Sequence, residues 1–91
     1  MHRNNAAHRI SIGGGKLVYE LLERTVDDMT MYGLEIRCSL FADDDVVRVD
    51  DISTDSDFAL ELLNTLADHV VTPCVAKEII EEYLTVYYTV S

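Results

Sequence analysis

The chain has 91 residues, of which 48% are hydrophobic, and its formal net charge at pH 7 is −10. This length corresponds to one domain whose folding buries only about 60% of the surface of the unfolded chain, so the core must be small. No apolar run approaches the roughly 18–20 residues of a membrane span, and the N-terminus lacks the apolar segment of a secretory signal. We therefore expect a cytoplasmic protein.

The charge is unevenly distributed along the chain. Residues 1–16 carry three basic residues and no acidic one, whereas the remainder carries four basic residues and all seventeen acidic residues. Proteins bind nucleic acids mainly by neutralising phosphates with Lys and Arg. The acidic balance therefore argues against nucleic-acid and anionic-membrane partners, and it favours a basic partner or simple solubility.

Met1–Lys16 has the composition of a disordered or flexible tail. Polar residues dominate it, and Gly13–Gly14–Gly15 is typical of a flexible joint. Ile10 and Ile12 leave open a short edge strand within this segment. We expect the single folded domain to comprise residues 17–91.

Leu17–Val26 is the first predicted strand, and it carries apolar residues on both faces. Two interpretations account for this pattern. Either the strand is covered on both sides, or it exposes an apolar face that is used for dimerisation. The second interpretation makes Val18 and Leu22 candidate interaction residues.

The clearest strand signal lies at Tyr32–Leu40, where apolar and polar residues alternate. Alternation turns one set of side chains to a core and the other to water. Gly33 falls on the polar face, where its missing side chain relieves crowding or marks a bulge. Val46–Ile52 is the third predicted strand. The short connections favour antiparallel hairpins, so we expect a three-stranded meander with Tyr32–Leu40 in its centre.

A first helix is predicted over Asp55–Val70. Thr54, with Asp57 three residues later, resembles a capping box at its start. His69 would end this helix, where the helix dipole favours a cation. The apolar face of the helix is broad enough to contact both the sheet and a second helix.

Thr72–Pro73 marks the start of a second helix, with Thr as N-cap and Pro in the first turn. Thr85–Val90 has high β-propensity, yet the helical apolar period continues through it. We expect helix to Leu84 and its continuation to Tyr88. The predicted fold is therefore α+β, an antiparallel three-stranded meander with two C-terminal helices packed on one face.

Short motifs in this chain resemble those of a known family. Tyr32–Ile36 reads YGLEI, Val49–Asp55 reads VDDISTD, and Val71–Pro73 leads to the acidic-aromatic-Leu ending of Ile79–Leu84. A family of small bacterial proteins of unknown function has a YGIEI strand, a V-x-DIS segment entering a helix, and a Pro-led final helix with such an ending.

The resemblance covers Leu17–Leu84 and implies a compact α+β domain in the bacterial cytoplasm. It implies no activity, because none is established for the family. This chain departs from the family pattern at Cys74–Val75, where an apolar residue and a histidine are expected. It also extends beyond the usual end of the family with Thr85–Ser91.

Seven aspartates lie between residues 43 and 57, which raises the question of a calcium loop. Such loops need oxygen ligands at alternating positions, a central glycine and a late glutamate. Val47 occupies the fifth position counted from Asp43, and no glycine follows. We therefore expect solvated carboxylates, with no metal site and no cofactor, and weak binding of a divalent ion is the alternative.

Cys74 is the one residue with a plausible reactive setting. It lies at the start of the second predicted helix, where the positive helix end favours the thiolate, and His69 lies just upstream. A Cys–His pair can act as a nucleophile. Acidic residues such as Glu78 oppose a thiolate, and no oxyanion hole is recognisable. Cys38 falls on the apolar face of its strand and is expected to be packed in the core.

The leading hypothesis is a non-enzymatic protein-interaction or accessory module that could also bind itself as a homodimer. Tyr87 and Tyr88 are candidate contacts near the C-terminus, since tyrosine is enriched at interfaces. The alternative is a small-ligand or thiol-dependent enzyme that uses Cys74 with His69.

Overall fold

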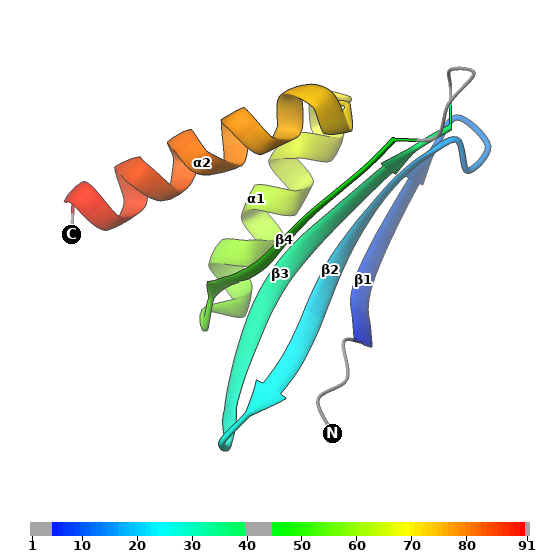
Figure 1. Ribbon diagram of the computed structural model, residues 1–91. Helices are drawn as coiled ribbons and strands as arrows, with labels where there is room; N and C mark the ends of the chain where they lie inside the picture. Colours follow the sequence, from blue (N-terminus) through cyan, green and yellow to red (C-terminus); the bar gives the residue numbers. More distant parts are fainter. Residues whose placement is uncertain (1–4, 40–44, 91) are drawn as a thin grey trace.

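The structure is a computed structural model that describes residues 5–39 and 45–90, and the side chains of residues 5–7 and 87–90 lie outside the description. The elements in chain order are β1 (Asn5–Ile12), β2 (Leu17–Val26), β3 (Met29–Cys38), β4 (Asp45–Ser53), α1 (Ser56–Asp68) and α2 (Pro73–Val90). Figure 1 shows one twisted sheet with both helices on the same side of it.

The sheet is an antiparallel meander in the order β1-β2-β3-β4. The predicted α+β class, the antiparallel sheet and the two C-terminal helices are confirmed. The predicted number of strands is wrong, because the sheet has four strands and not three. The additional strand is β1, which lies in the segment expected to be a tail and pairs with β2 from Asn5↔Glu23 to Ile12↔Leu17.

The strand β1 is stabilised by packing of its apolar residues against the core. Ile10 and Ile12 alternate with Arg9 and Ser11, and both isoleucines pack against the core. The glycines at positions 13 to 15 all have positive φ values of 65°, 69° and 89°, which glycine adopts readily. The glycine run is therefore the turn of a β1–β2 hairpin.

The next turn is also tighter than expected. Asp27 and Asp28 have φ values of 50° and 64°, and Val26 pairs directly with Met29. Two-residue hairpin loops with positive φ at both central positions match the right-handed twist of the flanking strands. As a result, β3 begins at Met29, three residues before the start of the predicted alternation at Tyr32.

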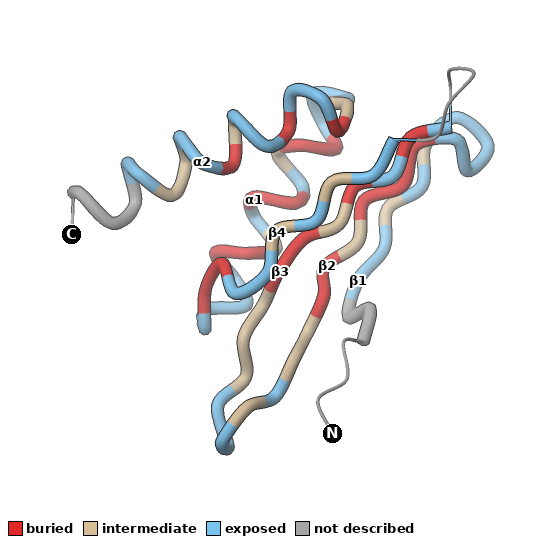
Figure 2. Tube along the Cα trace, viewed as in Figure 1, coloured by how far each residue is buried: buried red, intermediate tan, exposed pale blue. Residues whose placement is uncertain are grey.

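The hydrophobic core lies between the helices and one face of the sheet. Ile36 is fully buried, whereas its neighbour Arg37 is exposed, so the predicted orientation of the central strand is correct. Cys38 is buried, as predicted. Leu40 lies outside the described residues. Figure 2 shows the buried segments running along β2 and β3 and along the inner side of α1. The side chains with the largest fully buried volumes are Tyr19, Leu17, Leu34, Ile36, Leu62, Leu63, Leu66, Ile80 and Cys38.

Gly33 lies opposite an irregularity in β4. The β3–β4 register shifts between Tyr32↔Ser53 and Leu34↔Val49. A Cβ atom on Gly33 would lie 2.6 Å from the Val49 carbonyl oxygen. Both predicted explanations for this glycine therefore hold, since the bulge brings the β4 backbone against it.

The N-cap of α1 is Asp55, whose carboxylate accepts hydrogen bonds from the backbone N–H groups of Asp57 (3.0 Å) and Phe58 (3.3 Å). The predicted capping box at Thr54 is therefore wrong by one residue. Ser53 also assists, because its hydroxyl accepts a hydrogen bond from the Asp55 N–H at 2.9 Å. His69 ends the helix as predicted, and its Nδ1 lies 2.8 Å from the Thr65 carbonyl oxygen.

A buried tyrosine ties the sheet to the connection between the helices. The Tyr19 hydroxyl donates a hydrogen bond to the Val71 carbonyl oxygen at 2.7 Å, and Tyr19 is fully buried. Burial, with a smaller contribution from Cys38, raises the pKa of Tyr19 to about 12. The neutral phenol is therefore the form that the fold requires.

The helix α2 extends to Val90, so the expected continuation beyond Leu84 is confirmed and the local β-propensity of Thr85–Val90 is overridden. Ala76 and Ile80 in its first half are fully buried. Its second half projects past α1, away from the sheet (Figure 1). No helix in the described part of the chain combines the length and the apolar character needed to cross a bilayer.

Candidate functional site

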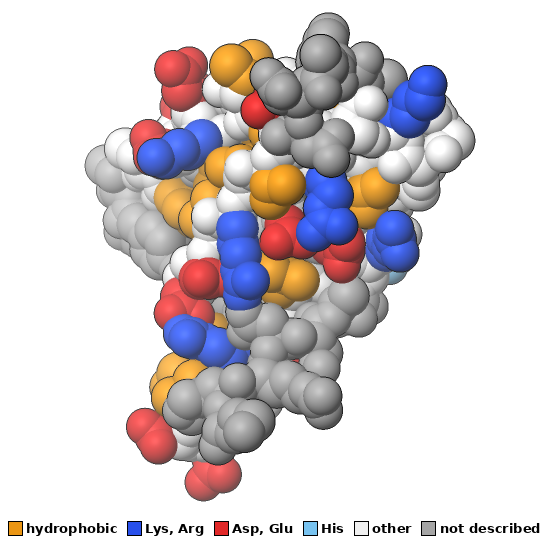
Figure 3. Space-filling view, turned by 45° about the vertical axis from the view of Figure 1, so that its right-hand side comes forward, with side chains coloured by type: hydrophobic (Ala, Val, Ile, Leu, Met, Phe, Trp, Pro, Cys, Tyr) orange, Lys and Arg blue, Asp and Glu red, His pale blue; other side chains and the backbone are white. Residues whose placement is uncertain are grey.

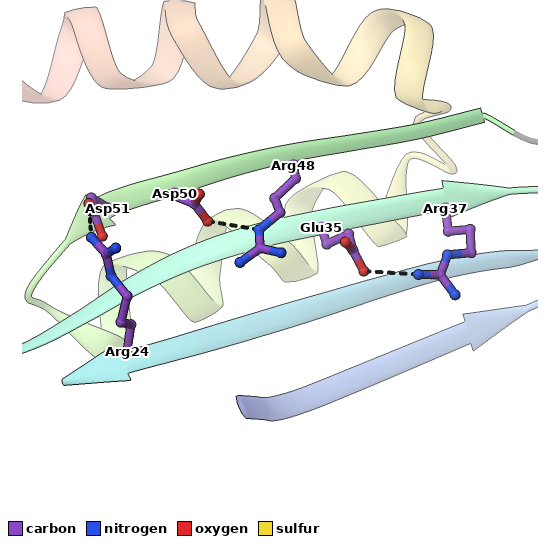
Figure 4. A network of polar contacts seen from close by, with 6 residues as sticks. All are labelled: Arg24, Glu35, Arg37, Arg48, Asp50 and Asp51. Atoms are coloured by element: carbon purple, nitrogen blue, oxygen red, sulfur yellow. Dashed lines mark hydrogen bonds and ion pairs between the residues drawn. The ribbon is translucent and has the colours of Figure 1, made fainter. Parts of the chain in front are cut away.

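The face of the sheet that is turned away from the helices is charged. Figure 4 shows three ion pairs on it: Arg24 with Asp51, Arg37 with Glu35 at 3.3 Å, and Arg48 with Asp50 at 2.9 Å. Lys and Arg side chains alternate with Asp and Glu side chains across this face (Figure 3). Exposed ion pairs of this kind contribute only about 0–1 kcal/mol each. Among the described residues of this face, positive and negative side chains are therefore balanced.

Val18 and Leu22 belong to the same face, and they are buried. Their exposed fractions are 5% and 8%, although they are not part of the core cluster beneath the helices. In the register, Val18 lies opposite Arg37, and Leu22 lies opposite Gly33. These two side chains offer little apolar surface to a partner.

The structure does not bring Cys74 and His69 together as a nucleophile and its base. Cys74 is exposed and lines a shallow hollow with Lys77 of α2 and residues 45–47 of β4. The His69 ring is turned to the carbonyl oxygen of Thr65 in its own helix. Among the described residues, no hydrogen bond joins the two side chains, and no group of three His, Cys, Asp or Glu residues is arranged to hold a metal ion.

A different feature stands out on the helical layer. An apolar groove with a volume of about 470 Å³ runs between the start of α1 and residues 79–86 of α2. Phe58 forms the α1 side, and its ring lies 6.3 Å from the ring of Tyr83, centroid to centroid, at an interplanar angle of 47°. The α2 side is formed by Ile79, Glu82, Tyr83 and Val86. We refer to these five residues as the helix groove.

The helix groove exists because α2 has more apolar surface than its own core uses. At about 100° per residue, Val75, Ile79 and Val86 share one stripe of the helix. The fully buried Ala76 lies about 100° around the helix from Val75, on the side that faces the sheet. Val75 and Val86 keep 47% and 58% of their surface exposed. This stripe therefore lies beside the core and is only partly covered.

The surroundings of the helix groove are acidic. Glu82 lines it, and Glu78 lies one turn earlier on the same flank of α2 and is exposed. On the other side, the exposed Asp57 precedes Phe58. Within α1 and α2 the sequence contains six acidic residues and one basic residue, Lys77.

The residues of the helix groove were not predicted as a site. The sequence-based candidates nearby are Tyr87 and Tyr88, whose side chains lie outside the described residues. The signal that pointed to this region was the width of the apolar arc on the last helix, which covers about half of its circumference. The contribution of Phe58 could not be found in this way, because it comes from another helix.

The chain matches the model of a family of unknown function (DUF6514) over residues 7–86. The chain therefore belongs to this family, and the expected membership of a family of unknown function is confirmed. The match begins within β1 and ends within α2, and it contains all of β2, β3, β4 and α1. Neither the curated proteins nor the solved structures contain a match to the chain.

Proposed function

We propose that this domain is a non-enzymatic protein-interaction module of the bacterial cytoplasm, and that its binding surface is the helix groove. The observation that carries the proposal is the apolar stripe of α2, because Val86 remains 58% exposed beside a hollow lined by aromatic and aliphatic side chains. Aromatic residues that line a pocket beside exposed apolar surface are typical of protein-binding sites.

The cytoplasmic assignment is supported by the cysteines. Both Cys38 and Cys74 are free, and a reducing compartment keeps thiols in that state. Self-association is one form of the proposed function, in which a second copy would cover the helix groove.

A thiol-dependent enzyme has less support. Cys74 and His69 occupy different surroundings, as described above, and the hollow beside Cys74 is lined by none of the groove residues.

The proposal can be tested by comparing two exposed valines. Val86 lines the helix groove, whereas Val46 on β4 is 53% exposed and lies outside it. Immobilised wild-type protein, Val86→Ser and Val46→Ser are incubated with lysate of the native host, and the retained proteins are quantified by mass spectrometry. We expect a protein that wild type and Val46→Ser retain and Val86→Ser loses. An identical retained set for all three proteins would refute the groove as the binding surface.

A further inference from the structure

We infer that the helix groove binds an amphipathic helix of a partner protein, with Lys or Arg residues flanking the apolar stripe of that helix. This inference rests on the proposed function, because it names the partner of the same site. Its basis is the length of the apolar stripe, the kind of backbone that the site can accept, and the sign of the surrounding charge.

The dimensions of the stripe suit a short helix. The groove residues Ile79 and Val86 are seven positions apart on α2, which corresponds to roughly 10 Å at 1.5 Å per residue. A partner helix of about two turns would present apolar residues along this distance. Tyr83 lines the groove and is only partly buried, so it is the aromatic side chain that a partner can contact, whereas Phe58 is 9% exposed and offers little surface.

The position of the helix groove favours a helix over an extended peptide. An extended segment binds by adding a strand to a sheet edge, where unpaired N–H and C=O groups accept it. The groove is formed by side chains of α1 and α2, whose backbone groups are bonded within the helices or, at the start of α1, to the Asp55 cap. A partner there must satisfy its own backbone, and a helix does so internally.

The charge around the helix groove selects a basic partner. Glu82 lines the groove, the exposed Glu78 lies one turn earlier on the same flank of α2, and no Lys or Arg is among the five lining residues. Lys77 lies about 200° from Val75 around the helix and therefore on another side of α2. Basic side chains beside the apolar stripe of the partner would meet carboxylates, whereas acidic ones would be repelled.

The same charges disfavour a second copy of this chain as the occupant. A twofold contact through α2 would bring Glu82 and Glu78 of one copy toward those of the other. Each copy also carries a net charge of −10. Like charges brought together without partners oppose association.

Two synthetic peptides with the same apolar stripe test the inference. One carries Lys and Arg on the flanks of the stripe, and the other carries Glu at the same positions. Their affinities for the full-length chain are measured by fluorescence anisotropy at low and high salt. We expect the basic peptide to bind about tenfold more tightly, from two or three screened charge pairs, and this difference to shrink as salt screens the charges.

Variants of the chain assign the effect to the helix groove. Glu82→Gln should weaken binding of the basic peptide by about two- to fivefold, while Glu81→Gln, next to it on α2 but outside the groove, should leave the affinity unchanged. Val86→Ser should weaken binding of both peptides, because it removes apolar contact only.

Absence of binding, equal affinities, or tighter binding of the acidic peptide would overturn the inference. A dimer in sedimentation velocity that Val86→Ser dissociates would also overturn it, since a second copy would then occupy the groove. The two proposals fail separately. If Val86→Ser loses a lysate partner but the two peptides bind with equal affinity, the interaction function is supported and the basic partner helix is refuted. If Val86→Ser changes neither measurement, both proposals fall.

Discussion

Gly33 is the residue on which the contact between β3 and the bulged part of β4 depends. A methyl group there would lie 2.6 Å from the Val49 carbonyl oxygen and 3.1 Å from the Asp50 Cα, and both of these atoms belong to the backbone. A backbone cannot yield as the end of a flexible side chain can, so Gly33→Ala must displace part of β4. We expect a loss of about 2–3 kcal/mol in the free energy of unfolding, measured by urea titration.

Arg37→Ala is a suitable comparison for Gly33→Ala, because it truncates a side chain on the same face of the same strand. Arg37 is exposed, and its ion pair with Glu35 spans 3.3 Å, so we expect a change below about 1 kcal/mol. Equal effects of the two substitutions would show that the close approach at Gly33 carries no penalty.

Tyr19 makes the stability of the domain sensitive to alkaline pH. Its pKa is raised from 10.0 to about 12 in the folded chain by burial and, to a smaller extent, by Cys38. Because the folded state resists loss of the phenolic proton, the contribution of Tyr19 is fully present below about pH 10. It declines as the pH rises toward about 12, by up to about 1.4 kcal/mol per pH unit.

Tyr19→Phe separates this titration from those of the other tyrosines. Near neutral pH we expect the variant to be less stable by about 1–2 kcal/mol, because the carbonyl of the half-buried Val71 loses its hydrogen bond from Tyr19. Between about pH 9 and about pH 11 the difference in free energy of unfolding between wild type and Tyr19→Phe should become smaller, because wild type loses stability faster. Urea unfolding at these pH values measures this difference. A difference that does not change with pH would contradict the role of Tyr19 in the loss of stability at alkaline pH.

At the scale of elements, the start of α1 allows a direct comparison between sequence and structure. The capping box at Thr54 predicts that this side chain stabilises the helix, whereas the structure gives the role to Asp55. Asp55→Ala should therefore lower the free energy of unfolding by about 1 kcal/mol, within the usual range for loss of an N-cap. Thr54→Ala should cost little, because Thr54 is exposed and makes none of the observed capping bonds. The reverse order in thermal unfolding would restore the sequence-based cap.

The strands and helices were predictable where a long periodic pattern was present. The bounds of β2 match the prediction, and α2 continues through Thr85–Val90 because the helical period extends over the whole segment. β1 was expected only as an alternative, since Ile10 and Ile12 are few and a glycine run follows them. A run of three glycines is found both in flexible joints and in tight turns. Only the pairing of β1 with β2 identifies this run as a turn.

At the scale of the whole molecule, the helix groove lay beyond sequence reasoning for a geometric reason. Its two sides come from Phe58 in α1 and Val86 in α2, and only the packing of the helices on the sheet places them together. The pattern of α2 does indicate surplus apolar surface, but not where on the helix it remains uncovered. Cys74 and His69 were likewise candidates because of their closeness in sequence, but the His69 ring lies against the Thr65 carbonyl oxygen, whereas Cys74 lines a hollow beside β4.

The extent of the folded unit can be tested by removing residues 1–13 from the chain. The sequence predicts a domain over residues 17–91, whereas in the structure β1 pairs with β2 along eight residues and places Ile10 and Ile12 against the core. Without β1, one edge of β2 loses its backbone partners and the core loses two half-buried isoleucines. We expect the free energy of unfolding to fall by about 2–4 kcal/mol.

Substitutions in the full-length chain show whether that loss comes from packing. Ile10→Ser combined with Ile12→Ser should reproduce a large part of it, because it removes the apolar contacts but keeps the backbone pairing of β1. Ser11→Ala lies between them on the exposed face and should change stability by less than about 0.5 kcal/mol. A shortened chain as stable as the full one would place the boundary of the domain after β1, since an edge strand that folds with the sheet cannot be removed without cost.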